Sequence, residues 1–162
     1  MARTFTLPKK GTGLWNEGWH TVTITKAETG ELDNGSKYID AWFDGYPDNF
    51  NMRIYEKIGK DGEEFAVGNL FRFANAGITD ALESAEGETV IKMNDDTKEL
   101  VGKTVNTYFY KDGKFTRILG QVAPVPFKNI VEEFTDRDVK YFKGRCESFF
   151  SKWVEPKLKD VP

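Results

Sequence analysis

Aromatic and positively charged side chains alternate with apolar ones along two neighbouring segments of the chain. Successive side chains of a β-strand point to opposite faces, so one face of these segments is apolar and the other is polar or aromatic. The second face carries Tyr38, Trp42, Arg53 and Tyr55. Exposed aromatic rings can stack on unpaired bases, at about 1–3 kcal/mol per base, while nearby cations contact phosphates. The pattern therefore predicts binding of a single nucleic-acid strand.

Other residues extend this candidate site. Tyr108 and Tyr110 alternate with apolar residues in a later segment, and three cations surround an Asp-Gly turn that would lie beside the site. The full predicted single-stranded-DNA-binding set is Lys37, Tyr38, Trp42, Arg53, Tyr55, Tyr108, Tyr110, Lys111, Lys114 and Arg117. The alternative is that some of these aromatic residues pack beneath an acidic insertion or a C-terminal helix. For Tyr108 and Tyr110 this packing role is favoured over a binding role. For Arg53 a binding role is favoured, because a cation between exposed aromatics has few structural roles.

No pattern typical of an enzyme competes with this interpretation. His20 is the single histidine, so a histidine-based zinc site or a catalytic triad is not expected. Asp40, Asp44 and Asp48 could hold a metal in a nuclease, but carboxylates that are solvated or ion-paired are the favoured interpretation. No glycine loop of the phosphate-binding type is present. We therefore expect no catalytic residue, no metal and no cofactor.

Length and composition predict one domain with appendages, located in the cytoplasm. The chain has 162 residues, of which 39% are hydrophobic and 30% charged. No apolar run approaches the roughly 20 residues that cross a bilayer, and the start has no hydrophobic signal segment. The single cysteine, Cys146, suits a reducing compartment and is expected to be a small buried side chain.

Charge is unevenly distributed along the chain. The net charge is −3, but residues 61–100 carry −7 and residues 101–162 carry +4. The negative net charge argues against a protein that coats nucleic acid through a generally basic surface. A basic groove is still compatible with it if the acidic residues lie on the far side of the molecule.

Hydrophobic periodicity predicts five strands and two main helices. Turn signals occur at Asn34-Gly35 and Asp112-Gly113, and Gly77 is the expected C-cap of the first helix. An acidic insertion at about 80–99 is interpreted as a solvated loop that ends in a short helical turn capped near Asp95-Asp96. The expected strands are 19–28, 37–44, 50–57, 103–111 and 114–122, and the expected helices are 63–78 and 136–154.

This order is typical of an OB-fold, a mainly β five-stranded barrel with a helix between the third and fourth strands. A generic antiparallel β domain with a helix on one side is the alternative. The expected organisation is an N-terminal arm at 1–14, an OB-fold domain at 15–127 and a C-terminal helical extension at 128–162. The aromatic stripe of that last helix is expected to cover the barrel, with pairing to a second copy as the alternative.

Four stretches of the chain resemble the small single-stranded-DNA-binding proteins of tailed phages. They are Trp19-His20-Thr21-Val22-Thr23-Ile24, Tyr38-Ile39-Asp40-Ala41-Trp42-Phe43, Asn69-Leu70-Phe71-Arg72-Phe73 and Leu100-Val101-Gly102-Lys103. The resemblance covers roughly residues 15–125. It implies an OB-fold, single-strand binding, and a role in phage DNA replication or recombination in the host cytoplasm. The chain differs from many such proteins at its end, where Lys157 to Pro162 replaces an acidic partner-recruiting tail.

These observations support three hypotheses of function. The first is a non-catalytic, sequence-independent single-stranded-DNA-binding protein, with replication or recombination proteins as further partners. The second is a protein-interaction module of a phage replication complex that uses the same face and the C-terminal helix. The third, least favoured, is a metal-dependent nuclease.

Overall fold

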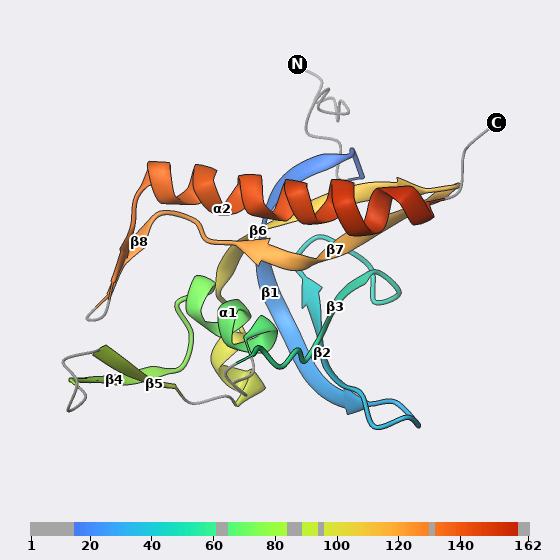
Figure 1. Cartoon of the computed structure of the whole chain (residues 1–162). Helices are drawn as coiled ribbons and strands as arrows, with labels where there is room; N and C mark the ends of the chain where they lie inside the picture. Colours follow the sequence, from blue (N-terminus) through green and yellow to red (C-terminus); the bar gives the residue numbers. More distant parts are fainter. Residues whose placement is uncertain (1–14, 61–64, 84–88, 94–95, 130–131, 159–162) are drawn as a thin grey trace, which may run out of the picture.

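A five-stranded antiparallel sheet with the order β3-β2-β1-β6-β7 forms the centre of the molecule (Figure 1). The computed structural model describes residues 15–60, 65–83, 89–93, 96–129 and 132–158, so the predicted arm at 1–14 lies outside the described residues. The strands are β1 (Gly18–Glu31), β2 (Lys37–Phe43), β3 (Asn51–Tyr55), β6 (Thr104–Asp112) and β7 (Phe115–Ala123). The five strands predicted from periodicity are thus confirmed, with shifted ends.

The long strand β1 joins the two halves of the sheet. Its first part, 18–23, pairs with β6, and its second part, 24–31, pairs with β2. A register shift between Ile24 and Lys26 separates the two parts and lets the strand bend. The sheet curls so far that its end strands approach each other. A Cβ atom added to Gly120 of β7 would lie 2.9 Å from the carbonyl oxygen of Arg53 in β3.

The apolar face of the sheet forms the core, as the alternation predicts. The inward residues of β1, β2 and β3 are all buried: Val22, Ile24, Ile39, Ala41, Phe43, Met52 and Ile54. Helix α1 (Ala66–Phe73) adds a buried stripe that includes Val67, Leu70 and Phe71. Burial of these apolar side chains forms the core on one face of β1–β3. The opposite face carries the polar and aromatic side chains.

Helix α1 is shorter than predicted and its C-cap is a different residue. The C-cap is Ala74, and the left-handed residue that follows it is Asn75, with a φ of 56°; Gly77 also has a positive φ, of 69°, but lies beyond the end of the helix. The N–H of Ala76 donates to Phe71 O at 2.9 Å, and the N–H of Asn75 donates to Arg72 O at 3.2 Å. These two bonds form a Schellman motif, for which asparagine can replace glycine because it tolerates the left-handed conformation.

The acidic insertion is not the open loop that its composition predicted. It contains a two-stranded antiparallel hairpin, β4 (Ile78–Glu83) and β5 (Thr89–Met93). Threonine, valine and isoleucine at 89–91 favour extended backbone, and the acidic residues masked this signal. The predicted helical turn after the hairpin is confirmed as η1 (Thr97–Leu100), in which the Asp96 side chain accepts from the N–H of Lys98.

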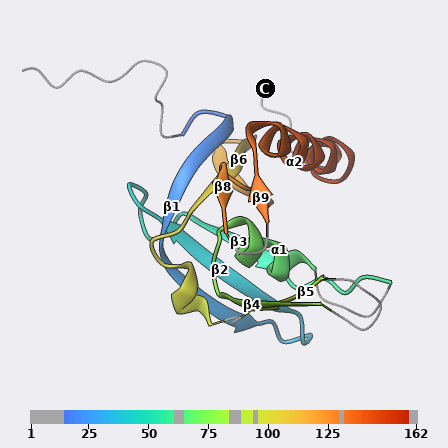
Figure 2. The ribbon, with the colours of Figure 1, turned by 90° about the vertical axis from the view of Figure 1, so that its left-hand side faces the viewer.

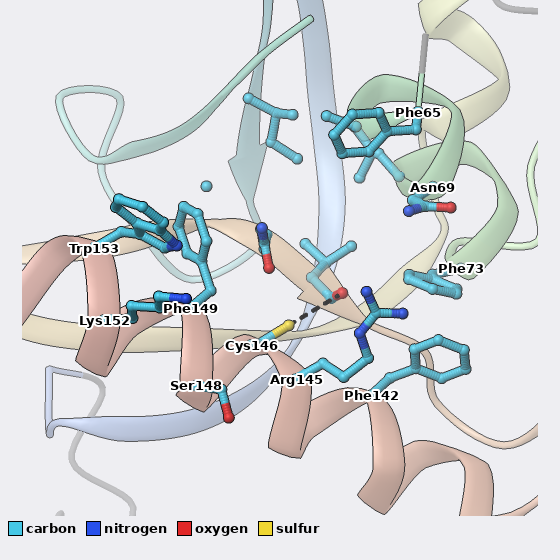
Figure 3. Close-up of a pocket in the computed structure, with 16 residues that line it drawn as sticks. Phe65, Asn69, Phe73, Phe142, Arg145, Cys146, Ser148, Phe149, Lys152 and Trp153 are labelled. Carbon is cyan, nitrogen blue, oxygen red and sulfur yellow. Dashed lines mark hydrogen bonds between the residues drawn. The ribbon is translucent and has the colours of Figure 1, made fainter. Parts of the chain in front are cut away.

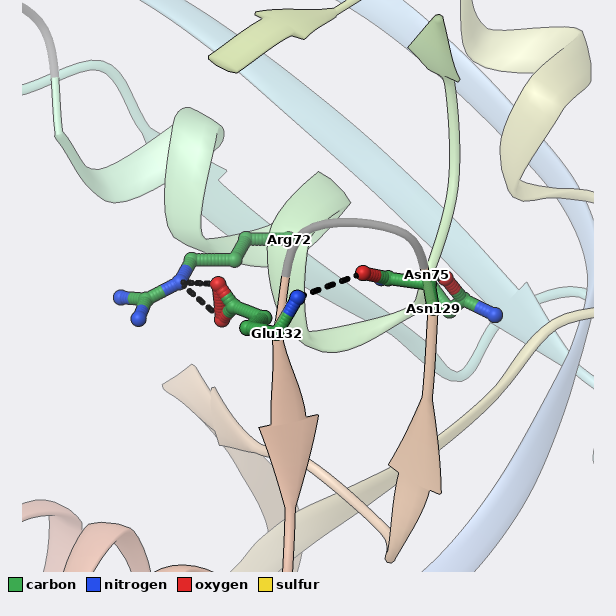
Figure 4. Close-up of polar contacts among 4 residues, drawn as sticks. All are labelled: Arg72, Asn75, Asn129 and Glu132. Atoms are coloured by element: carbon green, nitrogen blue, oxygen red, sulfur yellow. Dashed lines mark hydrogen bonds and ion pairs between the residues drawn. The ribbon is translucent and has the colours of Figure 1, made fainter. Parts of the chain in front are cut away.

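A second small hairpin, β8 (Phe127–Lys128) with β9 (Glu133–Phe134), was not predicted. Two contacts join it to α1 and to the residue Asn75 just after that helix (Figure 4). Arg72 Nε donates to Glu132 Oε1 at 2.7 Å, and Asn129 Nδ2 donates to Asn75 Oδ1 at 2.8 Å. These polar contacts hold the hairpin that leads into the C-terminal helix.

Helix α2 (Asp136–Phe149) lies across β6 and β7 (Figures 1 and 2). A capping box between Thr135 and Asp138 starts it, and a π-helical turn (Phe150–Val154) and a 3-10 turn (Glu155–Lys157) extend it. Cys146 Sγ donates to Val122 O at 3.6 Å, and Phe150 is buried with Leu119 of β7. The part of the stripe around Cys146 and Phe150 therefore packs on the chain's own sheet, as expected, while Trp153 stays exposed. None of the helices in the described part of the chain is long and apolar enough to cross a membrane.

Candidate nucleic-acid interface

The outward side chains of β1, β2 and β3 form three aligned rows, which together are named the outer face. The register places Gly30 beside Tyr38 and Tyr38 beside Tyr55. The next rows are Glu28, Asp40 and Arg53, and then Lys26, Trp42 and Asn51. Alternation predicted that Tyr38, Trp42, Arg53 and Tyr55 share one face, and the register confirms it.

Tyr38 is the central ring of the outer face. Its ring centroid lies 5.8 Å from that of Tyr55 in an edge-on arrangement, and Arg53 Cζ lies 3.8 Å from its centroid. The ring also reaches across β1, since a Cβ added to Gly30 would collide with Tyr38 Cζ. A glycine opposite an aromatic residue gives that ring room to cover the neighbouring strand. Tyr55 remains 40% exposed at the edge.

Arg53 is held in place by Asp40 on the adjacent strand. Its Nε and Nη2 donate to the two carboxylate oxygens of Asp40 at 2.7 and 2.9 Å. Hydrogen bonds to Asp40, and then to Tyr55, raise the pKa of Arg53. This two-point pairing is a structural role that the sequence interpretation did not foresee. It keeps the guanidinium against the Tyr38 ring and neutralises much of its charge.

Trp42 lies at the other end of the outer face. Its indole N–H donates to Asp48 O at 2.8 Å, and Lys26 Nζ lies 4.8 Å from the ring centroid. Lys26 also contacts Glu28 at 3.2 Å. Trp42 is half-buried, so part of its ring is accessible to a ligand. Lys26 is an exposed cation of the outer face that the sequence interpretation missed. Simple alternation would place Lys26 on the same inward face as Ile24. The register shift between these two residues moves Lys26 onto the outer face instead.

The predicted cations at the β6–β7 turn form a separate group. Lys111 donates to the Thr116 hydroxyl, and Arg117 Nε lies 2.8 Å from Asp112 Oδ2. Lys114 is exposed in the turn itself, beside Gly113 with a φ of 63°. Lys37, the remaining predicted cation, is exposed at the start of β2. By alternation along β2 its side chain points to the face opposite that of Tyr38, so none of these four cations belongs to the three rows of the outer face.

Tyr108 and Tyr110 do not join the outer face. Their rings lie 5.1 and 5.2 Å from the ring of Phe150, beneath the end of α2. Burial is the main cause of the raised pKa of both phenols. The alternative favoured for them from the sequence is the arrangement found. With α2 docked, these two tyrosines stabilise the packing of the helix on β6.

Three other residues singled out in the sequence have packing roles. His20 stacks on Phe109 with ring centroids 4.0 Å apart, and its Nε2 lies 2.7 Å from Asn16 O. Trp19 donates to Glu147 Oε1 at 2.9 Å, which ties β1 to α2. Burial raises the pKa of the Cys146 thiol to about 12, so it behaves as a small core residue.

The outer face continues beyond β3 to the C-terminal helix. Asn51, Arg53 and Tyr55 alternate along β3, and the next residue at this spacing is Lys57. Its Nζ lies 4.7 Å from the ring centroid of Phe149 in α2. The spacing of Arg53, Tyr55 and Lys57 could have predicted Lys57 as a member. Nothing in the sequence predicts Phe149 beside it, because that contact depends on how α2 docks.

Among the described residues, no three His, Cys, Asp or Glu side chains are grouped so that they could hold a metal ion. Asp40, considered as a ligand above, is instead paired with Arg53. Comparison with known proteins adds no identity: no protein-family model, curated protein or solved structure matches this chain.

Proposed function

We propose that the protein binds single-stranded DNA without sequence preference and supports phage DNA replication or recombination, without catalysing a reaction. The observation that carries the proposal is the outer face, where Tyr38, Trp42 and Tyr55 are arranged in register with Arg53 on the central ring. Every base has a planar face, so such rings bind a strand with little regard to its sequence.

The fold that we propose for this function is an OB-type barrel. Three features support it: the strand order, the helix between β3 and β6, and the close approach of β7 to β3 at Gly120. In such barrels the face of the second and third strands, flanked by two loops, binds oligonucleotides. The outer face lies on the equivalent strands, β2 and β3.

Charge pairing on the outer face shapes the expected binding. Arg53 is paired with Asp40, and Lys26 with Glu28. Stacking is therefore expected to contribute more than phosphate contacts, and the salt dependence should be shallow. For single strands the logarithm of the binding constant falls by about 0.7 per neutralised phosphate for each tenfold rise in salt.

The test is an anisotropy titration of labelled oligo-dT, oligo-rU and duplex DNA at low and moderate salt. Wild-type protein should bind the single strands and bind the duplex weakly. Tyr38→Ala and Tyr55→Ala should each lose about 1–3 kcal/mol of binding free energy, or about 5- to 140-fold in affinity. Tyr141→Ala is the matched control, because Tyr141 is an exposed tyrosine on α2, away from the outer face.

Arg53 is avoided in this test, because its removal would leave the carboxylate of Asp40 without its partner. Unchanged affinity in both tyrosine variants would place binding elsewhere on the molecule. The near neutrality of the outer face also favours a second function, an OB-like module that binds another replication protein. Capture of a protein partner, with no oligonucleotide bound even at low salt, would establish that function in place of the first.

A further inference from the structure

A groove of about 330 Å³ lies between α1 and α2, over the line where β3 and β7 approach each other (Figure 3). The two strands are the ends of the sheet and are not hydrogen-bonded neighbours. Ile54 of β3 and Gly120 and Val122 of β7 contribute to its floor. The curl of the sheet thus leaves a groove between β3 and β7. Helices α1 and α2 lie on either side of this groove and do not fill it.

The walls of the groove combine exposed rings with polar groups. Phe65, the N-cap of α1, is 45% exposed, and Trp153, in the π-helical turn that follows α2, is 55% exposed. Asn69 and Gln121 add amide groups, which can donate and accept hydrogen bonds. Apolar rings with a few amides suit a flat, partly polar ligand of the size of a nucleobase.

Among the described residues that line the groove, the charged side chains are all positive. Arg145 and Lys152 line it, and no acidic residue is among the described residues that do so. The described lining residues thus place positive charge near the rings of the groove. A ligand with a planar base and a negative phosphate matches this combination better than an apolar peptide.

The groove is continuous with the outer face. Arg53, Tyr55 and Lys57 are spaced at alternate positions, and Lys57 reaches the ring of Phe149, which lines the groove. The carbonyl of Lys57 also accepts from the N–H of Phe65 at 3.0 Å, which places the two residues side by side. Lys57 therefore links β3 to two rings of the groove, those of Phe149 and Phe65.

We propose that this groove is a second contact site for the same nucleic-acid strand. The strand leaves the outer face past Tyr55 and Lys57, and its next nucleotides enter the groove between Phe65 and Trp153. There the bases contact the two rings, and Arg145 and Lys152 contact the phosphates. This inference rests on the proposed function and assigns α2 a role in setting the length of strand that one molecule covers.

The test is a length series of oligo-dT from about 4 to about 20 nucleotides, which spans the roughly 4–16 nucleotides that one OB-type domain covers. Trp153→Ala and Phe65→Ala should bind the shortest oligonucleotides like wild type and lose about 5- to 140-fold in affinity for the longest. Tyr55→Ala should weaken binding at every length. Tyr141→Ala, on the same helix and outside the groove, should match wild type throughout.

The outcomes separate the two proposals. If Trp153→Ala and Phe65→Ala match wild type at every length while Tyr55→Ala is weakened, the groove is not part of the path and the outer face remains the binding site. A groove that serves a protein segment would give this same result and would overturn the inference. If wild-type protein binds no oligonucleotide of any length, both proposals fail together.

Discussion

Two parts of one sheet each carry a pair of outward-facing tyrosines, and the surroundings of the two pairs differ. On β2 and β3, Tyr38 and Tyr55 lie on a face that no other described element covers with a ring contact, and Arg53 contacts Tyr38. On β6, Tyr108 and Tyr110 lie two residues apart on one strand, beneath Phe150 in the turn that follows α2. Outward tyrosines thus form an exposed aromatic surface in one region and a helix-docking surface in the other.

The difference arises from the segment that comes after each strand in the chain. β2 and β3 are joined by a short loop, while β7 leads through the β8–β9 hairpin into an amphipathic helix. That helix needs an apolar surface, and β6 and β7 offer one in Leu119, Tyr108 and Tyr110. Once α2 is docked there, the outer face of β1–β3 is the aromatic surface left open to a ligand.

The largest change in the free energy of unfolding is expected from a substitution that removes the contact between Phe150 and the two tyrosines of β6. Phe150→Ala removes the ring that joins both tyrosines of β6 to α2, and large-to-small changes of this kind cost about 3–5 kcal/mol. The free energy of unfolding should fall by this amount in urea denaturation. If it changes by less than about 1 kcal/mol, α2 does not depend on this contact and the contrast between the regions is weaker than described.

Cys146 provides a second readout of the same change. Burial raises the pKa of its thiol to about 12, so the reactive thiolate is scarce near neutral pH and alkylation of native protein should be slow. Because this pKa is raised by folding, the associated stability is complete below the unfolded pKa of about 8.5 and is lost as pH rises toward the folded value. Phe150→Ala should speed alkylation.

An intermediate change in the free energy of unfolding is expected at Gly120, where β7 lies close to β3. In Gly120→Ala the new Cβ would lie 2.9 Å from the carbonyl oxygen of Arg53, a backbone atom that cannot move alone. Overpacking of this kind costs about 1–3 kcal/mol, which thermal or urea unfolding would measure. Gly144→Ala is the control: its Cβ meets nothing within 4 Å, and removing a helical glycine should stabilise by about 0.5–1 kcal/mol.

The smallest change in stability is expected on the outer face. Gly30→Ala would place a Cβ against Tyr38 Cζ, but a tyrosine ring can rotate away, so the free energy of unfolding should change by less than about 1 kcal/mol. Oligo-dT affinity should nevertheless fall by about 5-fold or more, because the central ring is displaced. Unchanged affinity would show that the position of Tyr38 is unimportant for binding.

Much of the sheet could be predicted because strand periodicity is a local property. The inward positions from Val22 to Ile54 are all buried, and the turns at Gly35 and Gly113 lie between the predicted strands. The hairpin within the acidic insertion was missed because charge obscured a short β-branched signal. The left-handed residue that ends α1, Asn75, was missed because glycine has the stronger preference for a left-handed φ.

The sequence by itself determined which side chains share a face, since alternation is a property of the backbone of each strand and needs no knowledge of its neighbours. It placed Tyr38, Trp42, Arg53 and Tyr55 together for this reason. Only the tertiary structure decided which faces stay open, that Asp40 pairs with Arg53, and that Lys57 meets Phe149. These contacts join residues from separate elements, and they depend on strand register and on the docking of α2, which no local pattern encodes.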